Sequence, residues 1–161
     1  MERVTQKPYN ESSENQQFVV FDIDGKIYGI NILLTESIER MHRITRVPKS
    51  PSEITGVINL RGDIVPLLCM RKILGYKDKG YTDLTRIIIV QFEEYRIGLI
   101  VDQVHDVLTV PSDDIQLSMD ELTEKEKVYI SGIINMNEQP LMLIDIPKTL
   151  EKINIIDKQG V

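Results

Sequence analysis

The chain contains an internal repeat, and this repeat restricts the folds that the chain can adopt. Two segments recur in the same order and without gaps, the first at an offset of 69 residues and the second at an offset of 76 residues. The aligned segments are residues 18–39 with 87–108, and residues 54–74 with 130–150. Because the second offset is the longer one, the second copy should contain a longer connection, which we assign to residues 112–129. A chain with this pattern is expected to form one small fold twice.

Both copies consist of short runs rich in Ile, Val, Leu, Phe and Tyr, separated by turn residues, as in antiparallel strands. Asp24-Gly25 lies between the first two runs and predicts a hairpin, because this dipeptide favours the positive φ of a tight turn. Pro66 lies inside the run 64–70 and predicts an edge strand, since proline cannot donate a ladder hydrogen bond. Each copy offers about five strands and one helical turn at its end, and this number of strands closes into a small barrel.

We therefore predict an all-β fold of two similar five-stranded β-barrels packed together, with short helical turns. The sequence leaves open whether strands are exchanged between the barrels. Residues 1–16 are polar, with almost nothing to bury, and are predicted to form a flexible tail.

The 161-residue chain carries a formal net charge of −6, which argues against binding nucleic acid, because neutralising phosphates needs clustered Lys and Arg. The one basic cluster, Arg40–Arg46, is interpreted as a solvated surface. No segment approaches the ~20 apolar residues of a transmembrane helix, and the polar N-terminal segment lacks the apolar core of a signal peptide. Cys69 is the single cysteine, so no intrachain disulfide can form, and we expect a cytoplasmic protein without membrane insertion.

The residues that catalysis would need are few and scattered. His42 and His105 are the only histidines, and together with Cys69 they lack the spacing of a zinc site. The sequence also lacks a glycine-rich phosphate loop. We predict no catalytic, cofactor-binding or metal-binding residues, and we interpret Cys69 as a buried packing residue.

The two copies differ most clearly at one turn, where Leu60-Arg61-Gly62-Asp63 aligns with Met136-Asn137-Glu138-Gln139. A feature present in only one copy is not required by the shared fold. An arginine in a tight turn would hold its guanidinium at a fixed place on the surface, which suits an interface anchor. The residues alone leave a second interpretation equally open, in which Arg61 is solvated or pairs with an internal acid such as Asp63.

The segment GVINLRGDIVPLLCMRKIL (56–74) resembles the CheW-like domain family, whose pattern is Gly-Val-x-Asn-Leu-Arg-Gly, an apolar pair, Pro, and a strand ending in Asp-Leu-Arg. FVVFDIDGKIYGINI (18–32) is similar to the opening hairpin of that family, and the segment 86–108 carries its Val-Asp-x-Val element. The resemblance covers 17–150, with a first half at about 17–84, a second half at about 85–150, and a C-terminal tail at 151–161. It implies two SH3-like five-stranded barrels.

The resemblance implies a non-catalytic adaptor that couples methyl-accepting chemoreceptors to the histidine kinase CheA in bacterial chemotaxis. The implied partners are the cytoplasmic tip of the receptor and the regulatory domain of the kinase. Carried over by motif, Thr35, Ile38 and Arg61 fall in the receptor-facing region. The family often has Val at the position of Thr35 and Glu at that of Ser37, and its Asp-Leu-Arg reads Cys69-Met70-Arg71 here.

A second function class is a small β-barrel that binds a small ligand or an oligonucleotide. Such a barrel would need basic or aromatic strand faces. The chain has no Trp, its aromatic content is 6%, and its net charge is negative. These features favour the adaptor.

Overall fold

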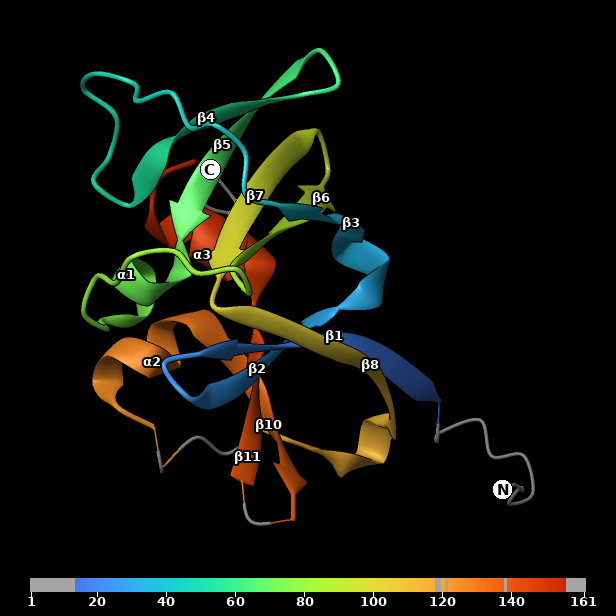
Figure 1. Cartoon of the computed structure of the whole chain (residues 1–161). Helices are drawn as coiled ribbons and strands as arrows, with labels where there is room; N and C mark the ends of the chain where they lie inside the picture. Colours follow the sequence, from blue (N-terminus) through green and yellow to red (C-terminus); the bar gives the residue numbers. More distant parts are fainter. Residues whose placement is uncertain (1–13, 118–119, 121, 138, 156–161) are drawn as a thin grey trace.

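The computed structural model describes residues 14–117, 120, 122–137 and 139–155, and strands form most of it (Figure 1). The first half contains β1 (Asn15–Ile23), β2 (Lys26–Asn31), the 3-10 turn η1 (Ile32–Leu34), β3 (Thr35–Arg40), β4 (Ile54–Leu60), β5 (Asp63–Cys69) and α1 (Met70–Leu74). The second half contains β6 (Arg86–Phe92), β7 (Tyr95–Val101), β8 (Gln103–Pro111), η2 (Ser112–Asp114), β9 (Ile115–Gln116), α2 (Glu124–Tyr129), β10 (Ile130–Met136), β11 (Gln139–Ile144) and α3 (Ile146–Lys152). The long connection predicted at 112–129 therefore holds η2, β9 and α2.

The strands form two mixed sheets, and each sheet takes strands from both halves of the chain. The five-stranded sheet has the order β3-β6-β7-β5-β4, and the six-stranded sheet has the order β8-β1-β2-β11-β10-β9. In Figure 1 the first sheet lies above the second, with α1 and α2 on the left of the molecule. The two halves are thus sequence repeats, but each barrel contains strands from both of them. Strands are therefore exchanged between the barrels, a point that the sequence left open.

The exchange is reciprocal and keeps the same register in both sheets. β5 and β7 pair in parallel with Leu67 opposite Gly98, and β11 and β2 pair in parallel with Leu143 opposite Gly29. The leucines are related by the 76-residue offset and the glycines by the 69-residue offset. The internal repeat seen in the sequence is therefore a repeat of strand pairing as well.

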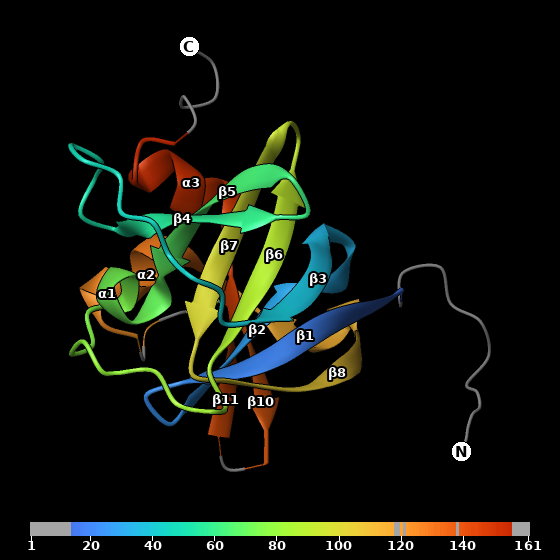
Figure 2. The same ribbon diagram turned by 45° about the horizontal axis from the view of Figure 1, so that its top comes forward.

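Each sheet closes through the segment that follows its outermost strand. In the five-stranded sheet, Thr45, beyond β3, forms an isolated bridge with Val57 of β4. In the six-stranded sheet, β9 follows β8 and pairs with β10, where Gln116 lies opposite Ile133. The prediction of two SH3-like barrels is confirmed (Figure 2).

Buried apolar side chains form two barrel interiors and a larger core between the barrels. Successive residues of one strand serve different cores, because side chains alternate between the faces of a strand. Ile87 and Ile89 of β6 point into the five-stranded barrel, whereas Ile88 and Val90 join the central core. This burial on both faces explains why the strand reads as an unbroken apolar run.

The prediction that Pro66 marks an edge strand is wrong. β5 lies between β7 and β4, so it has a neighbour on both sides. Its parallel pairing with β7 begins at Leu67, one residue after the proline. Pro66 is thus tolerated because it precedes the stretch of β5 that pairs with β7.

The ordered elements reach slightly into the segments assigned to tails. β1 begins at Asn15, α3 ends at Lys152, and Ile153 is buried in the central core. Residues 1–13 and 156–161 of the predicted tails lie outside the described residues. Among the described helices, none has the length and apolar character needed to cross a membrane.

Candidate functional site

The strand β3 carries two of the three predicted receptor-facing residues. A β-bulge between Thr35 and Ser37 sets the strand register, so that Thr35 lies opposite Val90 and Ile38 lies opposite Ile88. Because opposed residues of an antiparallel pair share a face, Thr35 and Ile38 share one face of the sheet despite their odd spacing. Ile38 is 44% exposed and lies on an outermost strand of the five-stranded sheet.

Arg61 lies at the tip of the hairpin formed by β4 and β5. It adopts a positive φ of 51°, and the Asn59 side chain accepts a hydrogen bond of 2.9 Å from the backbone N–H of Gly62. The Arg61 side chain is 65% exposed, and its Nη2 lies 3.5 Å from Glu39 Oε2. Ser37 Oγ donates a hydrogen bond of 2.8 Å to the same carboxylate oxygen. Arg61 therefore makes a long contact, exposed on the arginine side only, with an acid of β3.

Arg61 pairs with Glu39 and not with Asp63, the acid that the sequence suggested for it. Asp63 instead accepts a bond of 2.7 Å from Arg96 Nη1, while Arg96 Nε lies 3.0 Å from Glu36 Oε1. Arg96 thus connects β7 with β5 and β3. The two arginines make the adjoining rim of the five-stranded barrel strongly polar.

The structure brings Arg61 to β3, but on the face opposite to Ile38. Glu39, the partner of Arg61, lies opposite Ile87, whereas Ile38 lies opposite Ile88, and these two isoleucines point into different cores. Thr35, Ile38 and Arg61 are therefore neighbours around one outermost strand. A partner would have to contact both faces of β3 to bind all three.

The residue of the second copy that corresponds to Ile38 is also exposed and apolar, and it was missed in the sequence. Val107 of β8 is 46% exposed and is related to Ile38 by the 69-residue offset. It lies opposite Val19, just as Ile38 lies opposite Ile88, and both partners belong to the central core. The alignment of the two copies pairs Ile38 with Val107, so it could have indicated Val107 as a second exposed apolar position.

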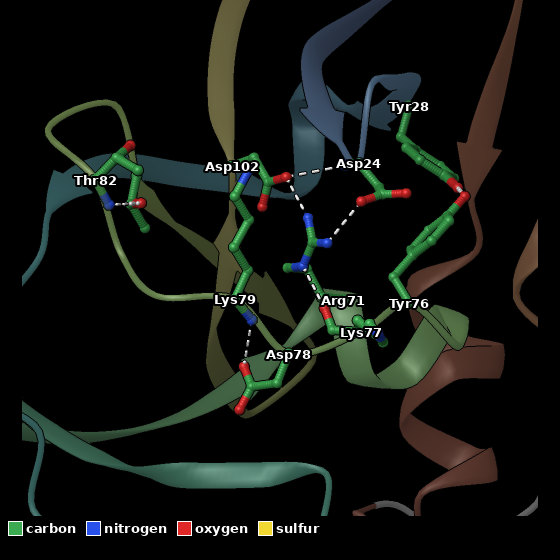
Figure 3. Close-up of polar contacts among 10 residues, drawn as sticks. Asp24, Tyr28, Arg71, Tyr76, Lys77, Asp78, Lys79, Thr82 and Asp102 are labelled. Atoms are coloured by element: carbon green, nitrogen blue, oxygen red, sulfur yellow. Dashed lines mark hydrogen bonds and ion pairs between the residues drawn. The ribbon is translucent and has the colours of Figure 1, made fainter.

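A second polar cluster joins the two barrels around Arg71 of α1 (Figure 3). Arg71 Nη1 donates to Asp102 Oδ2 at 2.6 Å, and Nη2 donates to Asp24 Oδ1 at 2.6 Å. Nε donates to the carbonyl oxygen of Lys77 at 2.8 Å, and the Arg71 side chain is only 8% exposed. Asp24 lies in the β1–β2 turn of one barrel, while Arg71 follows β5 of the other. We call Arg71, Asp24 and Asp102 the Arg71 cluster.

Aromatic and ionic contacts continue from this cluster towards α2. The Tyr76 ring lies 6.0 Å from the Arg71 guanidinium and 5.8 Å from Lys26 Nζ, and its hydroxyl lies 2.6 Å from that of Tyr28. Burial is the main cause that raises the pKa of Tyr28, and the contact with Tyr76 raises it further, so this phenol stays protonated. Lys26 Nζ lies 3.3 Å from Glu126 Oε2.

Glu126 forms the capping box at the start of α2. Its Oε1 accepts a hydrogen bond of 3.0 Å from the Thr123 backbone N–H, and Thr123 Oγ1 accepts one of 3.1 Å from the Glu126 N–H. Burial of the carboxyl opposes ionisation, but the bonds from Thr123 and Lys26 outweigh it and lower the pKa of Glu126. Glu126 is therefore a structural anion.

The groups with chemical reactivity remain apart from one another. His105 Nε2 lies 3.0 Å from Asp22 Oδ1, His42 Nε2 lies 3.9 Å from Glu39 Oε1, and Cys69 is buried at the end of β5. Within the described parts of the chain, no three His, Cys, Asp or Glu side chains are grouped to hold a metal ion.

The chain matches the family model of the CheW-like domain over residues 17–154. It is 35% identical over 142 residues to the chemotaxis protein CheW of Bacillus subtilis (strain 168), and the alignment covers 88% of this chain and 91% of that protein. It is 32% identical over 144 residues to the chemotaxis protein CheW of Klebsiella aerogenes, and this alignment covers 88% of this chain and 87% of that protein.

A solved structure shares the arrangement as well. The crystal structure of the scaffolding protein TtCheW from Thermoanaerobacter tengcongensis matches with a TM-score of 0.75 and 30% sequence identity. The match covers 82% of this chain and 90% of that chain. This chain and the solved structure are therefore similar in both sequence and fold over most of the length of each molecule.

Proposed function

This chain belongs to the CheW-like domain family and is a chemotaxis coupling adaptor, and we propose that it joins methyl-accepting chemoreceptors to the histidine kinase CheA in the cytoplasm. In this role it is non-catalytic, and its partners are the cytoplasmic tip of the receptor and the regulatory domain of the kinase. An adaptor acts by presenting two surfaces in a fixed relation, which two barrels packed on one core provide. Binding of a small ligand inside a barrel is not favoured, because both described barrel interiors are filled by apolar side chains. Binding of an oligonucleotide is not favoured, because the chain carries a net charge of −6.

We place the receptor-binding surface at Thr35, Ile38 and Arg61. The observation that carries this assignment is the exposed Ile38 on an outermost strand, beside an arginine that is itself largely exposed. An exposed apolar side chain gains free energy when a partner covers it, and an arginine fork adds directed hydrogen bonds.

The contact between Arg61 and Glu39 leaves the arginine available to a partner. At 3.5 Å it is long for an ion pair, and the exposed guanidinium retains donors that point to no described acid. Exposed ion pairs contribute only about 0–1 kcal/mol, so a receptor carboxylate or carbonyl can replace or join Glu39 at small cost.

The test uses Arg61→Asn and Ile38→Ala, titrated separately against a receptor tip fragment and the kinase regulatory domain. Asparagine occupies the equivalent turn position 137, also with positive φ, so Arg61→Asn removes the guanidinium without straining the turn. Truncating an interface anchor typically costs about 2 kcal/mol or more, which is roughly a thirtyfold loss of affinity. We expect that loss for the receptor fragment and near-normal binding of the kinase domain.

Asn137→Ala is the matched control, because it changes the equivalent turn in the other copy. It should leave receptor binding unchanged, and thermal melting should confirm that all variants fold. Unchanged receptor affinity of folded Arg61→Asn and Ile38→Ala would remove both residues from the site. A selective loss of kinase binding would assign this surface to the kinase instead.

A further inference from the structure

A surface pocket of about 470 Å³ lies at the end of the β4–β5 hairpin that is remote from Arg61. It is bounded by the segment that precedes β4 and by the loop that follows α1. The residues that matter for its chemistry are Arg46, Pro51, Ile54, Cys69, Lys72 and Tyr81. Since β4 spans seven residues, the pocket and the Arg61 turn are separated by roughly 20 Å of strand. The pocket is therefore distinct from the surface assigned to the receptor.

The pocket is lined by cations that have no acidic partner among the described residues. Arg46 makes no ion pair there, and Lys72 Nζ donates only to the backbone carbonyl of Ser52 at 3.4 Å. Asp78 is the only acid among the lining residues, and its Oδ1 already accepts a hydrogen bond of 2.9 Å from the Lys79 N–H (Figure 3). The two lining cations, Arg46 and Lys72, therefore outnumber the single lining acid.

The segment that leads into the pocket adds to this charge. Arg43, Arg46 and Lys49 are exposed, and the chain between them carries no Asp or Glu. The sequence interpretation of this basic segment as solvated agrees with its exposure, but it gave the segment no role. Cations concentrated in one place on a chain of net charge −6 create a local positive field inside a negative surround.

We propose that this pocket binds an acidic, partly apolar linear segment of a partner protein. Carboxylates of the segment would pair with Arg46 and Lys72, and an apolar side chain would contact Ile54, Pro51 and the ring of Tyr81. The volume lies in the range of pockets that hold small ligands or a few side chains. This site is additional to the receptor surface and does not depend on its assignment.

A short peptide fits this pocket better than an extended polyanion does. A nucleic acid or an anionic membrane would meet the acidic remainder of the surface, which carries all of the net negative charge, and would be repelled there. A short acidic segment contacts only the positive region. The apolar lining residues also match a peptide side chain and have no counterpart in a phosphate backbone.

The experiment measures binding of a fluorescently labelled short peptide of glutamate and leucine to the full chain at low salt. The variants are Arg46→Glu and Lys72→Glu. The matched control is Lys148→Glu, since Lys148 is exposed on α3 and is related to Lys72 by the 76-residue offset. We expect Arg46→Glu and Lys72→Glu each to weaken binding about fivefold or more, and Lys148→Glu to weaken it less than about twofold.

Each other outcome overturns the proposal. Equal losses in all three variants would show general attraction to positive charge, and no loss in any of them would place the peptide elsewhere. Absence of binding by the wild-type chain would remove the site. Vesicles containing phosphatidylglycerol serve as a further probe, and binding of vesicles but not of peptide, lost in Arg46→Glu and Lys72→Glu, would identify a lipid surface instead.

Discussion

Cys69 and Asp145 occupy the same place in the two copies, immediately before a helix. Their backbones are alike, with φ and ψ of −86° and 104° at Cys69, and of −92° and 101° at Asp145. The Asp145 side chain accepts a hydrogen bond of 2.9 Å from the Lys148 N–H and caps α3, whereas Cys69 makes no such bond to α1. The departure from the Asp of the family pattern therefore leaves α1 without a side-chain cap.

Cys69→Ser should consequently be more stable than Cys69→Ala. A serine hydroxyl at this position can accept a hydrogen bond from the first turn of α1, and a side-chain cap contributes about 0.5–2 kcal/mol relative to alanine. Urea denaturation should give the serine variant a higher free energy of unfolding by about that amount. Asp145→Ser and Asp145→Ala form the control pair and should differ in the same direction. A serine variant no more stable than the alanine variant would show that the buried hydroxyl costs as much as the cap contributes.

Glu126 gives the stability of the protein a dependence on acid pH. Because its pKa is lowered in the folded state, its ionised form stabilises the fold above the unfolded-state value of about 4.3, and this stabilisation is lost as pH falls through the folded-state pKa. Glu126→Gln should lower the free energy of unfolding at neutral pH by about 1–2 kcal/mol, and this difference should shrink below about pH 4. Denaturation of both proteins across this pH range provides the measurement.

Glu124 provides the control for this prediction, since it lies in the same first turn of α2 but its side chain is 93% exposed. Glu124→Gln should change stability little at any of these pH values. If the difference in free energy of unfolding between wild type and Glu126→Gln stays constant from neutral to acid pH, the carboxylate charge does not stabilise the fold.

At the scale of elements, the repeated glycines mark the points where strands approach side chains closely. A Cβ added at Gly98 would lie 2.5 Å from Leu67 Cδ2 and 2.8 Å from Ile87 Cγ2. At Gly29, the equivalent position, the nearest atom is Leu141 Cδ2 at 3.0 Å. The two barrels therefore use the same glycine position with different tolerance.

Gly98→Ala should destabilise the protein more than Gly29→Ala does. Overpacking of a close-packed core typically costs about 1–3 kcal/mol, and Gly98→Ala should reach that range, whereas small side-chain shifts can accommodate Gly29→Ala at less than about 1 kcal/mol. Thermal or urea denaturation of the two variants compares equivalent substitutions within one molecule. Equal losses would indicate that Leu67 moves aside as easily as Leu141 does.

Local signals in the sequence predicted the strands and the repeat, but not how the strands combine. The Asp24-Gly25 turn fixes a hairpin, because turn geometry depends on a few adjacent residues. Exchange of strands depends on which apolar faces bury each other across the whole molecule, and the alternation pattern is the same with or without exchange. The prediction from Pro66 was wrong for the same reason, since a proline is tolerated inside β5 only because the pairing with β7, a strand distant in the sequence, begins after it.

The candidate site shows the same division between local and distant information. Arg61 was found because one copy differs from the other, and its positive φ follows from the tight turn. Its partner Glu39 was not found, because the contact joins two strands that are far apart in the chain and depends on barrel closure. Arg71 was noted only as part of a family motif, and its role appears when Asp24 and Asp102 meet it from other elements.

At the scale of the whole molecule, the Arg71 cluster fixes one barrel against the other. Arg71 follows β5 of one barrel, Asp24 lies in a hairpin of the other, and Asp102 lies where β7 passes into β8. Loss of the arginine leaves two carboxylates facing each other without a cation. Contact surfaces that lie on different barrels keep a constant relation only if this junction is rigid.

Arg71→Met should therefore lower the free energy of unfolding by about 2–3 kcal/mol, somewhat less than for a fully buried pair, because Asp24 and Asp102 keep access to water. The double variant Arg71→Met with Asp24→Asn should be less destabilised than the sum of the two single variants, since the pair acts as one unit. Arg96→Met is the control, because Arg96 also joins two carboxylates but lies within one barrel and is more exposed, so its loss should be much smaller. Additive effects of Arg71→Met and Asp24→Asn, or an equal loss in Arg96→Met, would show that the cluster does not specifically hold the barrels together.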